Sequence, residues 1–323
     1  MKKGLAWLVT LIAAIAGAPT ASSAAYPDKP IHIVVPYTPG GTVDLLARAM
    51  APLLTKAWGQ QIVVENRPGA GGSVGAEYVA QRPGDGYTLL LSTNSPLTTN
   101  VVLFKSIKYD PLRDFVPVIL AGENSLALAV NDQLPVKSVT DLIALAKKEP
   151  GKLIGASSGN GTTSHLSLTE FNKQAGVKIT HVPYQGGVPS LTAVISGEAQ
   201  LVFCDIVPAL PMINGGKVRA LATTGLSRSG VTPNVPTLDE SGLKGFDVTA
   251  WIGMVAPKGT PAAVVDKLNT EINGILKQPD FRAHIIKIGI DPIGDTPQAF
   301  GQYFKAQIPV WRQRAIDAGL KVE

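Results

Sequence analysis

The stretch IVVPYTPGGTVDLLARAM, residues 33–50, carries the signals of a strand, a tight turn and a helix in immediate succession. β-Branched residues run up to a proline, and the turn residues PGGT (39–42) then end the strand. Beyond the turn, Leu45, Ala49 and Leu53 recur at the spacing of one helical face. The first turn of such a helix has unpaired N–H groups and a positive dipole end, so this segment is suited to hold an anion.

The same alternation of short β-branched runs and amphipathic stretches continues along the chain. After the opening unit come QIVVEN, GGSVGAEYVAQR and YTLLLS, and a second set begins with LALAV and SVTDLIALAKKE. It continues through LIGAS, TTSHLSLTEFNKQ, ITHVPY, SLTAVIS, LVFCD and VRALATT. Strands that alternate with helices predict βαβ units, and therefore parallel sheets with helices on both faces.

The first 25 residues have the pattern of a secretory signal peptide. Lys2 and Lys3 precede an apolar run from Leu5 to Ala16, and ASSAA then supplies small residues for cleavage after Ala25. The apolar run is too short to span a bilayer, which needs roughly 20 residues. Removing these 25 of the 323 residues leaves 298 and lowers the formal charge from +5 to +3. We therefore expect an exported, soluble mature protein.

The mature length favours two domains, and strand-like segments predict where the chain crosses between them. VPVILAGENSLALAV (116–130) reads as one crossing and FDVTAWIGMVAP (246–257) as the return. This predicts a discontinuous first lobe of residues 26–121 plus 247–323 and an inserted second lobe of residues 122–246. Helices near 261–277, 279–288 and 296–318 are expected to finish the chain.

Composition excludes several classes of partner. The small positive charge has no basic run behind it, so nucleic acid is not expected. The single cysteine, Cys204, has no partner for an internal disulfide, and we interpret it as a small buried residue on a strand. The sequence has no Cys/His cluster at metal spacing, and we expect neither a metal nor a cofactor.

Glycine and hydroxyl clusters follow several of the predicted strands. TPGGT, RPGAGGS and STNS come after the first three, while SSGNGTTSH, YQGG and Asp205 hold the equivalent places in the second set. In open α/β sheets ligands bind at the carboxyl ends of strands. Both domains are therefore expected to direct loops rich in N–H groups at the space between them.

These segments resemble those of the Bug family of periplasmic substrate-binding proteins, which serve tripartite tricarboxylate transporters. The resemblance rests on YPDKPIHIVVPYTPGGTVDLLAR (26–48), VVENRPGAGGSVGAEYVAQRPGDGYTLL (63–90), GASSGNGTTSHLSLTEF (155–171), HVPYQGGVPSLTAVISGEAQLVF (181–203), VRALATTG (218–225), NVPTLDESGL (234–243) and WIGMVAPKGTP (251–261). It implies an α/β fold with two lobes, of the type II or Venus-flytrap kind, with two parallel or mixed sheets flanked by helices. The two lobes would close over a ligand in the periplasm.

The resemblance also implies the partners. The ligand would be a small carboxylate, such as a di- or tricarboxylate, an aromatic carboxylate or an acidic amino acid. The protein would pass this ligand to integral-membrane permease subunits, would have no enzymatic activity and is expected to be a monomer. Sensing of the same ligand for a membrane signalling partner stays open as an alternative, because both roles would use the same closed form.

The residues that match the family's binding pattern fall on loops of both predicted lobes. Gln185 stands where the family often has a lysine, so a cation at that point is not expected. The candidate ligand-binding residues are Thr38, Pro39, Gly40, Gly41, Thr42, Ser92, Thr93, Asn94, Ser158, Gly159, Thr162, Thr163, Tyr184, Gln185, Gly186 and Asp205.

A carboxylate needs no Arg or Lys if several N–H groups converge on it at helix starts. Gly40 and Gly41 permit close approach, and Thr42 is expected to be the N-cap of its helix. A ligand that bridges the loops of both lobes stabilises the closed form, and ordered waters are expected to mediate part of the contact.

Four further residues invite a functional interpretation, and we expect structural roles for all of them. Asp44 lies in the first turn of a predicted helix, where an acid favours the helix dipole. Arg67 precedes a proline at a domain edge, and Trp251 is expected to pack in the core. His165 is expected to form a hydrogen bond at a helix face rather than to act in catalysis.

Two enzymatic alternatives are weaker. GGSVG (71–75) and GASSG (155–159) fit the G-x-S-x-G pattern, and Ser157, Asp205 or Asp239, and His284 follow the order of an α/β-hydrolase triad. Two copies of the pattern in a glycine-rich chain argue against a unique nucleophile, and no HGGG-like segment precedes either. A nucleotide site is not expected, because GAGGSVG lacks the G-x-G-x-x-G spacing.

Overall fold

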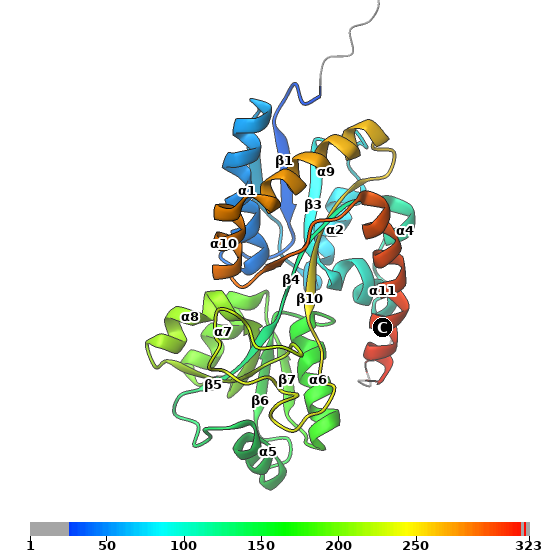
Figure 1. The fold of residues 1–323 in the computed structure, drawn as a ribbon. Helices are drawn as coiled ribbons and strands as arrows, with labels where there is room; N and C mark the ends of the chain where they lie inside the picture. Colours follow the sequence, from blue (N-terminus) through cyan, green and yellow to red (C-terminus); the bar gives the residue numbers. More distant parts are fainter. Residues whose placement is uncertain (1–25, 318–319, 321–323) are drawn as a thin grey trace, which may run out of the picture.

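A computed structural model describes residues 26–317 and residue 320 and contains two mixed sheets flanked by helices. Figure 1 shows the two parts, one above the other, joined by the long strands β4 and β10. The predicted signal peptide lies outside the described residues. No helix among the described residues is both long and apolar enough to cross a membrane.

The six-stranded sheet is built around parallel strands from the first part of the described chain. Its order is β11-β4-β10-β3-β1-β2, with β1 (Ile31–Val35) parallel to both β2 (Ile62–Asn66) and β3 (Thr88–Thr93). The other members are β4 (Phe115–Asn124), β10 (Ala250–Pro257) and β11 (Asp291–Pro292). β10 runs antiparallel to β3 and β4, so the sheet is mixed. We call this sheet and its helices lobe 1.

The five-stranded sheet has the order β7-β6-β8-β5-β9. Its strands are β5 (Leu126–Asn131), β6 (Ile154–Ser157), β7 (Thr180–Pro183), β8 (Leu201–Asp205) and β9 (Val218–Thr223). β6 is parallel to β7 and β8, whereas β5 is antiparallel to β8 and β9. We call this sheet and its helices lobe 2. The expected fold of two parallel or mixed sheets flanked by helices is confirmed, and both sheets are mixed because β5 and β10, which follow the two crossings, run against their neighbours.

Helices cover both sheets, as the alternating pattern predicted. Lobe 1 has α1 (Thr42–Trp58), α2 (Ser73–Ala80), α3 (Asn100–Leu103), α4 (Pro111–Asp114), α9 (Ala262–Lys277), α10 (Pro279–Lys287), α11 (Pro297–Asp317) and the short turns η1 (Ala70–Gly72) and η2 (Ser95–Thr99). Lobe 2 has α5 (Val139–Lys148), α6 (Thr163–Ala175), α7 (Gly187–Ser196) and α8 (Ile206–Asn214). The three helices predicted for the end of the chain are confirmed as α9, α10 and α11.

The last helix joins the cores of the two lobes. Near its start, Phe300 and Phe304 pack against the buried ring of Trp251 in lobe 1. Near its end, Trp311 belongs to the buried cluster of lobe 2. Figure 1 shows α11 running alongside both lobes. The expectation that Trp251 packs in the core is confirmed.

The chain passes between the sheets at two places. Only Ser125 separates β4 from β5, and the return lies between Thr223 and Ala250. The domain boundaries at 121/122 and 246/247 remain a prediction. Residues at or within two positions of the carboxyl ends of β1, β3, β6 and β8 line a shared cavity between the lobes, and this places the candidate site at the carboxyl ends of strands from both sheets.

Candidate functional site

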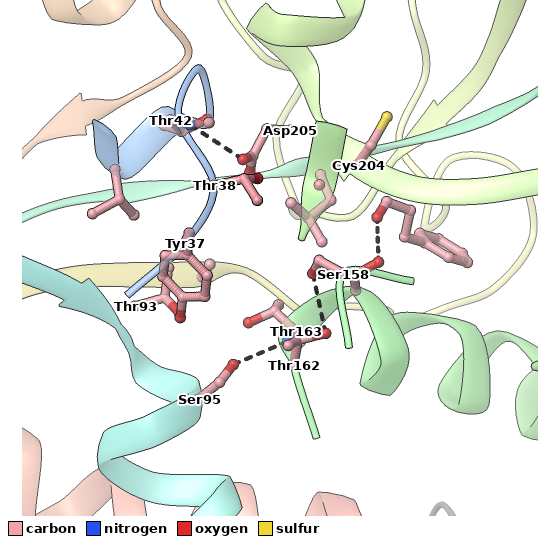
Figure 2. A pocket seen from close by; sticks show the side chains of 17 residues that line it. Tyr37, Thr38, Thr42, Thr93, Ser95, Ser158, Thr162, Thr163, Cys204 and Asp205 are labelled. Atoms are coloured by element: carbon pink, nitrogen blue, oxygen red, sulfur yellow. Dashed lines mark hydrogen bonds between the residues drawn. The ribbon is translucent and has the colours of Figure 1, made fainter. Parts of the chain in front are cut away.

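A cavity of about 60 Å³ lies between the two lobes. Figure 2 shows hydroxyl side chains from both lobes around it, with Asp205 and Cys204 on the lobe 2 side. Among the described residues, Asp205 is the sole acidic or basic side chain in the lining. The lining residues are Tyr37, Thr38, Gly41, Thr42, Val43, Thr93, Ser95, Leu126, Ser158, Thr162, Thr163, Ser164, Gly187, Phe203, Cys204, Asp205 and Ala250.

Half of the candidate residues from the sequence line this cavity. These are Thr38, Gly41, Thr42, Thr93, Ser158, Thr162, Thr163 and Asp205. The residues that do not line it are Pro39, Gly40, Ser92, Asn94, Gly159, Tyr184, Gln185 and Gly186. Ser92 is fully buried and next to Thr93 on β3, where successive side chains point to opposite faces. Asn94 lies beneath the lining, where its Oδ1 accepts a hydrogen bond from Thr163 Oγ1.

In the lobe-1 loop, which we define as Thr38–Thr42, two backbone N–H groups donate hydrogen bonds to carboxylates of the protein itself. Gly40 N–H donates to Asp44 Oδ2 over 2.9 Å, and Thr42 N–H donates to Asp205 Oδ2 over 3.3 Å. The prediction that Thr42 is the N-cap is wrong. Gly41 is the N-cap, without a side-chain bond, and Thr42 is the first helical residue. The two acids therefore take the place of a capping hydroxyl.

Asp44 is a structural residue at the start of α1 and does not line the cavity. Its side chain is buried and also accepts hydrogen bonds from Arg48 Nε and Asn66 Nδ2. Burial by itself raises the pKa of this carboxyl, but the bonds from Arg48, Gly40 and Asn66 outweigh burial and hold the pKa below its usual value. Asp44 is thus an ionised carboxylate that binds a backbone N–H beside the start of α1, which is the structural role expected for an acid in a first helical turn.

Asp205 joins the two lobes at the end of β8. One oxygen accepts the Thr42 N–H of lobe 1, and the other accepts from Asn124 Nδ2 at the end of β4, over 2.8 Å. Burial raises the pKa of this carboxyl above its usual value, although the bonds from Thr42 and Asn124 counteract that rise. Figure 2 shows Asp205 beside Thr42, with the hydrogen bond between them drawn as a dashed line. The acid lies at the lobe-1 end of the space where a ligand anion was expected.

The lobe-2 loop, which we define as Ser158–Thr163, is capped by neutral groups. Thr162 is the N-cap of α6, and its Oγ1 accepts the His165 N–H and donates to Gly159 O. Ser158 Oγ donates to Thr162 Oγ1 over 3.2 Å, and Thr163 N–H donates to Ser95 Oγ of lobe 1. Hydroxyl groups thus converge on the cavity at the start of a helix, without a carboxylate of the protein beside them.

Two stacked histidines support the lobe-2 loop from below. The rings of His165 and His181 lie 3.6 Å apart at an interplanar angle of 9°. Gly161 N–H donates to His165 Nδ1, and His181 Nε2 lies 2.6 Å from Ser157 Oγ. Burial lowers the pKa of His165 to about 3, with a contribution from His181, and lowers the pKa of His181 to about 4. Both rings are therefore neutral at neutral pH, and the expected hydrogen-bonding role of His165 is confirmed.

The residues considered for a serine hydrolase do not assemble into a triad. His284 is exposed on α10 of lobe 1, and Asp239 accepts hydrogen bonds from Lys244 and Gly245. Ser157 has His181 beside it, but its side chain is fully buried and its hydroxyl is bonded to Gly159. This hydroxyl therefore holds the loop rather than facing a substrate.

Several lining residues were missed by the sequence reasoning. Tyr37 directly precedes the lobe-1 loop, and its hydroxyl lies 2.5 Å from Thr93 Oγ1. Ser95 belongs to the STNS segment, whose first three residues alone were selected. Phe203 lies two residues before Asp205 and hence on the same face of β8. That period of two is the signal that identifies Phe203 once Asp205 has been selected.

Nothing among the described residues suggests a metal centre, since no group of three or more His, Cys, Asp or Glu side chains could hold an ion. Cys204 is buried on β8, as expected, although it also borders the cavity. Arg67 stacks over the ring of Tyr78 and pairs with Glu65, which confirms its structural role at the domain edge.

Comparison with known proteins agrees with this architecture. The family described as "Tripartite tricarboxylate transporter family receptor" matches residues 46–318. The chain is 35% identical to Protein BugT of Bordetella pertussis, over 100% of this chain and 99% of that protein. The solved structure of Rpa4515 from R. palustris with adipate has a TM-score of 0.89 at 36% identity, covering 92% of this chain and 99% of that one. MatC from Rhodopseudomonas palustris, with bound malate, has a TM-score of 0.83 at 33% identity, covering 90% and 99%.

Proposed function

The chain belongs to the tripartite tricarboxylate transporter receptor family, and from this premise we propose that it binds a small carboxylate in the cavity between its lobes. The observation that carries the proposal is the hydroxyl-rich start of α6 at that cavity, formed by Ser158, Thr162 and Thr163. Helix starts and neutral donors bind anions without a basic side chain. The bound adipate and malate of the two structural relatives support the ligand class.

The ligand carboxylate faces the lobe-2 loop rather than the lobe-1 loop. At the lobe-1 loop the N–H groups of Gly40 and Thr42 already bind Asp44 and Asp205, and the Asp205 carboxylate repels a second anion. The lobe-2 loop has only neutral acceptors around it, including the uncharged His165. An anion there therefore meets a positive helix end whose donors are not bonded to a carboxylate of the protein, with Asp205 at the lobe-1 end of the same cavity.

Closure of the lobes over the ligand is part of the proposal. The lobes touch through glycines, since a Cβ on Gly161 would lie 2.4 Å from Asn100 Oδ1, and one on Gly186 would lie 2.6 Å from Thr38 Oγ1. A ligand that contacts both lobes binds the closed form better than the open form and so shifts the population toward closure. The closed form would then deliver the carboxylate, in the periplasm, to a tripartite tricarboxylate permease.

A thermal-shift screen of mono-, di- and tricarboxylates tests the binding proposal. At least one carboxylate is expected to raise the melting temperature, because a ligand that binds only the folded state stabilises it. Sugars and metal cations serve as the negative set. A shift with members of that set and with no carboxylate contradicts the proposed ligand class. Reconstituting transport with the permease subunits distinguishes delivery from sensing.

A further inference from the structure

Four lysines lie at the end of lobe 2 that faces away from lobe 1. Lys147 and Lys148 belong to the last turn of α5. Lys152 and Lys178 lie two residues before β6 and β7. Because β6 is parallel to β7 and β8, and the carboxyl ends of β6 and β8 lie at the cavity, the residues that precede β6 and β7 are at the opposite edge of the sheet. Figure 1 shows α5 at this end of the lobe, and we call the four residues the lysine edge.

Backbone contacts bring the members of the lysine edge together. Gly151 N–H donates to Lys178 O over 2.7 Å, so the segments before the paired strands β6 and β7 run side by side. The stem of Lys178 passes near Gly151, where a Cβ would lie 3.8 Å from Lys178 Cδ and Cε. Lys152 N–H donates to Glu149 O, directly after the last turn of α5. The four lysines therefore belong to one surface.

This surface carries an unbalanced positive charge. The segments 147–152 and 176–180 contain the four lysines and one acid, Glu149, which leaves a formal charge of +3. All four lysines are exposed, and among the described residues none of their ammonium groups has an ion-pair or hydrogen-bond partner. Elsewhere in lobe 2, by contrast, Arg219 is paired with Asp132. The lysine edge is thus free to attract an anionic partner.

The chemistry of the lysine edge fits a surface of many anionic groups. A lysine ammonium is a strongly hydrated point charge on a flexible stem, whereas arginine suits the bidentate recognition of one phosphate or carboxylate. Protein interfaces have an apolar core and are depleted in lysine. None of the large hydrophobic side chains that are exposed in the described part of the chain lies in segments 147–152 or 176–180. A lipid surface therefore fits the edge better than a protein does.

We propose that the lysine edge is an electrostatic contact with an anionic phospholipid bilayer. A lysine close to such a surface strengthens binding about fivefold, and the attraction extends over a Debye length of about 10 Å at 0.1 M salt. Because the edge lies opposite the cavity, the protein lies on the bilayer without covering the carboxylate site. This contact goes beyond the proposed function and does not depend on it.

Co-sedimentation of the mature protein with lipid vesicles tests the contact. Vesicles of phosphatidylglycerol and phosphatidylcholine in equal parts are expected to bind the protein at about 0.1 M salt and to release it at about 1 M salt, where the Debye length falls to about 3 Å. Vesicles of phosphatidylcholine alone are expected not to bind it. Equal binding to both kinds of vesicle overturns the proposal. Binding to poly-glutamate with no binding to the anionic vesicles also overturns it, in favour of an acidic protein partner.

Two variants with the same change in charge distinguish the lysine edge from the net charge of the protein. Replacing all four of its lysines by glutamine is expected to weaken vesicle binding by about 100-fold or more, at about fivefold for each lysine. The control replaces four exposed lysines on helices of lobe 1 by glutamine, at Lys56, Lys277, Lys287 and Lys305. This control should weaken binding by less than about fivefold. An equal loss in the two variants overturns the proposal.

A charge-preserving variant separates the electrostatic contact from damage to the fold. Replacing the same four lysines by arginine keeps every positive charge and is expected to keep vesicle binding within about threefold of the original protein. The melting temperatures of all the variants, measured without any ligand, show that they are folded. Loss of binding in the folded arginine variant overturns the proposal. A failure of every carboxylate to bind would contradict the proposed function and leave these vesicle results as they are.

Discussion

The lobe-1 loop and the lobe-2 loop have similar sequences, but the polar groups at their helix starts have different partners, charged in lobe 1 and neutral in lobe 2. Both place glycines and threonines before a helix, yet the lobe-1 loop binds the carboxylates of Asp44 and Asp205, while the lobe-2 loop uses the Thr162 hydroxyl and the His165 ring. A helix start is an anion site only while its donors and its charge remain available. The difference supports our proposal that lobe 2 holds the ligand carboxylate and lobe 1 completes the enclosure.

The largest effect on ligand affinity is expected when a substitution disturbs the contact that the lobe-2 loop makes with lobe 1 in the closed form. Gly161→Ala introduces a Cβ that would lie 2.4 Å from Asn100 Oδ1 in lobe 1, and the closed form must shift to accommodate it. If closure becomes less favourable by about 3 kcal/mol, the apparent affinity falls about 100-fold. Calorimetric titration with the best carboxylate from the screen measures this loss.

Gly245→Ala is the matched control for Gly161→Ala. The two glycines have φ of +74° and +73°, but a Cβ on Gly245 meets nothing within 4 Å. An alanine in the left-handed region should lower the stability of both variants by about 1–3 kcal/mol. Only Gly161→Ala should also lose ligand affinity. Equal affinities in the two variants would show that this contact plays no part in closure.

Acid is expected to weaken lobe 2 through the stacked histidines. Because the pKa values of His165 and His181 are lowered to about 3 and about 4, the unfolded chain binds protons more readily than the folded protein. Their contribution to stability is complete above the unfolded pKa near 6.5 and is lost as pH falls toward 3. Denaturant unfolding between pH 7 and pH 4 measures the slope of the unfolding free energy against pH.

Substitution of the buried ring should change that slope. His181→Gln is expected to flatten the dependence of the unfolding free energy on pH, because it removes one group whose pKa differs between the two states. His284→Gln, on the exposed face of α10, is the control and should leave the slope unchanged. Identical slopes in all three proteins contradict the assigned role of the histidine pair.

Removal of the capping hydroxyl of the lobe-2 loop should have a smaller effect on ligand affinity. Thr162→Ala removes the N-cap of α6 and should cost about 1 kcal/mol of stability. It also removes a lining hydroxyl, so affinity for the carboxylate is expected to fall about tenfold. Ser138→Ala removes the equivalent cap of α5, away from the cavity, and should cost similar stability without loss of affinity. Parallel loss of affinity in both variants would assign the effect to folding.

The smallest effect is expected at the acid of the lobe-1 end. Asp205→Asn keeps an oxygen for the Thr42 N–H and removes the negative charge from the lining. Affinity for an anionic ligand should rise about threefold to tenfold as the repulsion disappears. Asp266→Asn, on the exposed surface of α9, removes the same charge elsewhere and should not change affinity. A loss of affinity in Asp205→Asn alone would mean that the acid assists the ligand.

Much of the fold follows from periodicity and turn chemistry, and the details of the site do not. Thr38, Gly41 and Thr163 were correctly predicted to lie at the site, because each belongs to a short cluster of glycine and hydroxyl residues that directly follows a predicted strand. The bond from Thr42 to Asp205 joins residues 163 positions apart, and no local pattern contains it. The alternation of strands and helices by itself predicted parallel strands, and only the family resemblance allowed mixed sheets, because the direction of β5 depends on where the chain crosses between lobes.

Amide hydrogen exchange with and without a saturating carboxylate compares the two loops directly. We expect the ligand to protect the amides of Ser158–Thr163 more strongly than those of Thr38–Thr42, where Gly40 and Thr42 are bonded to carboxylates already. Protection confined to Thr38–Thr42, or absent from both loops while the ligand binds, would contradict the claim that the start of α6 holds the carboxylate.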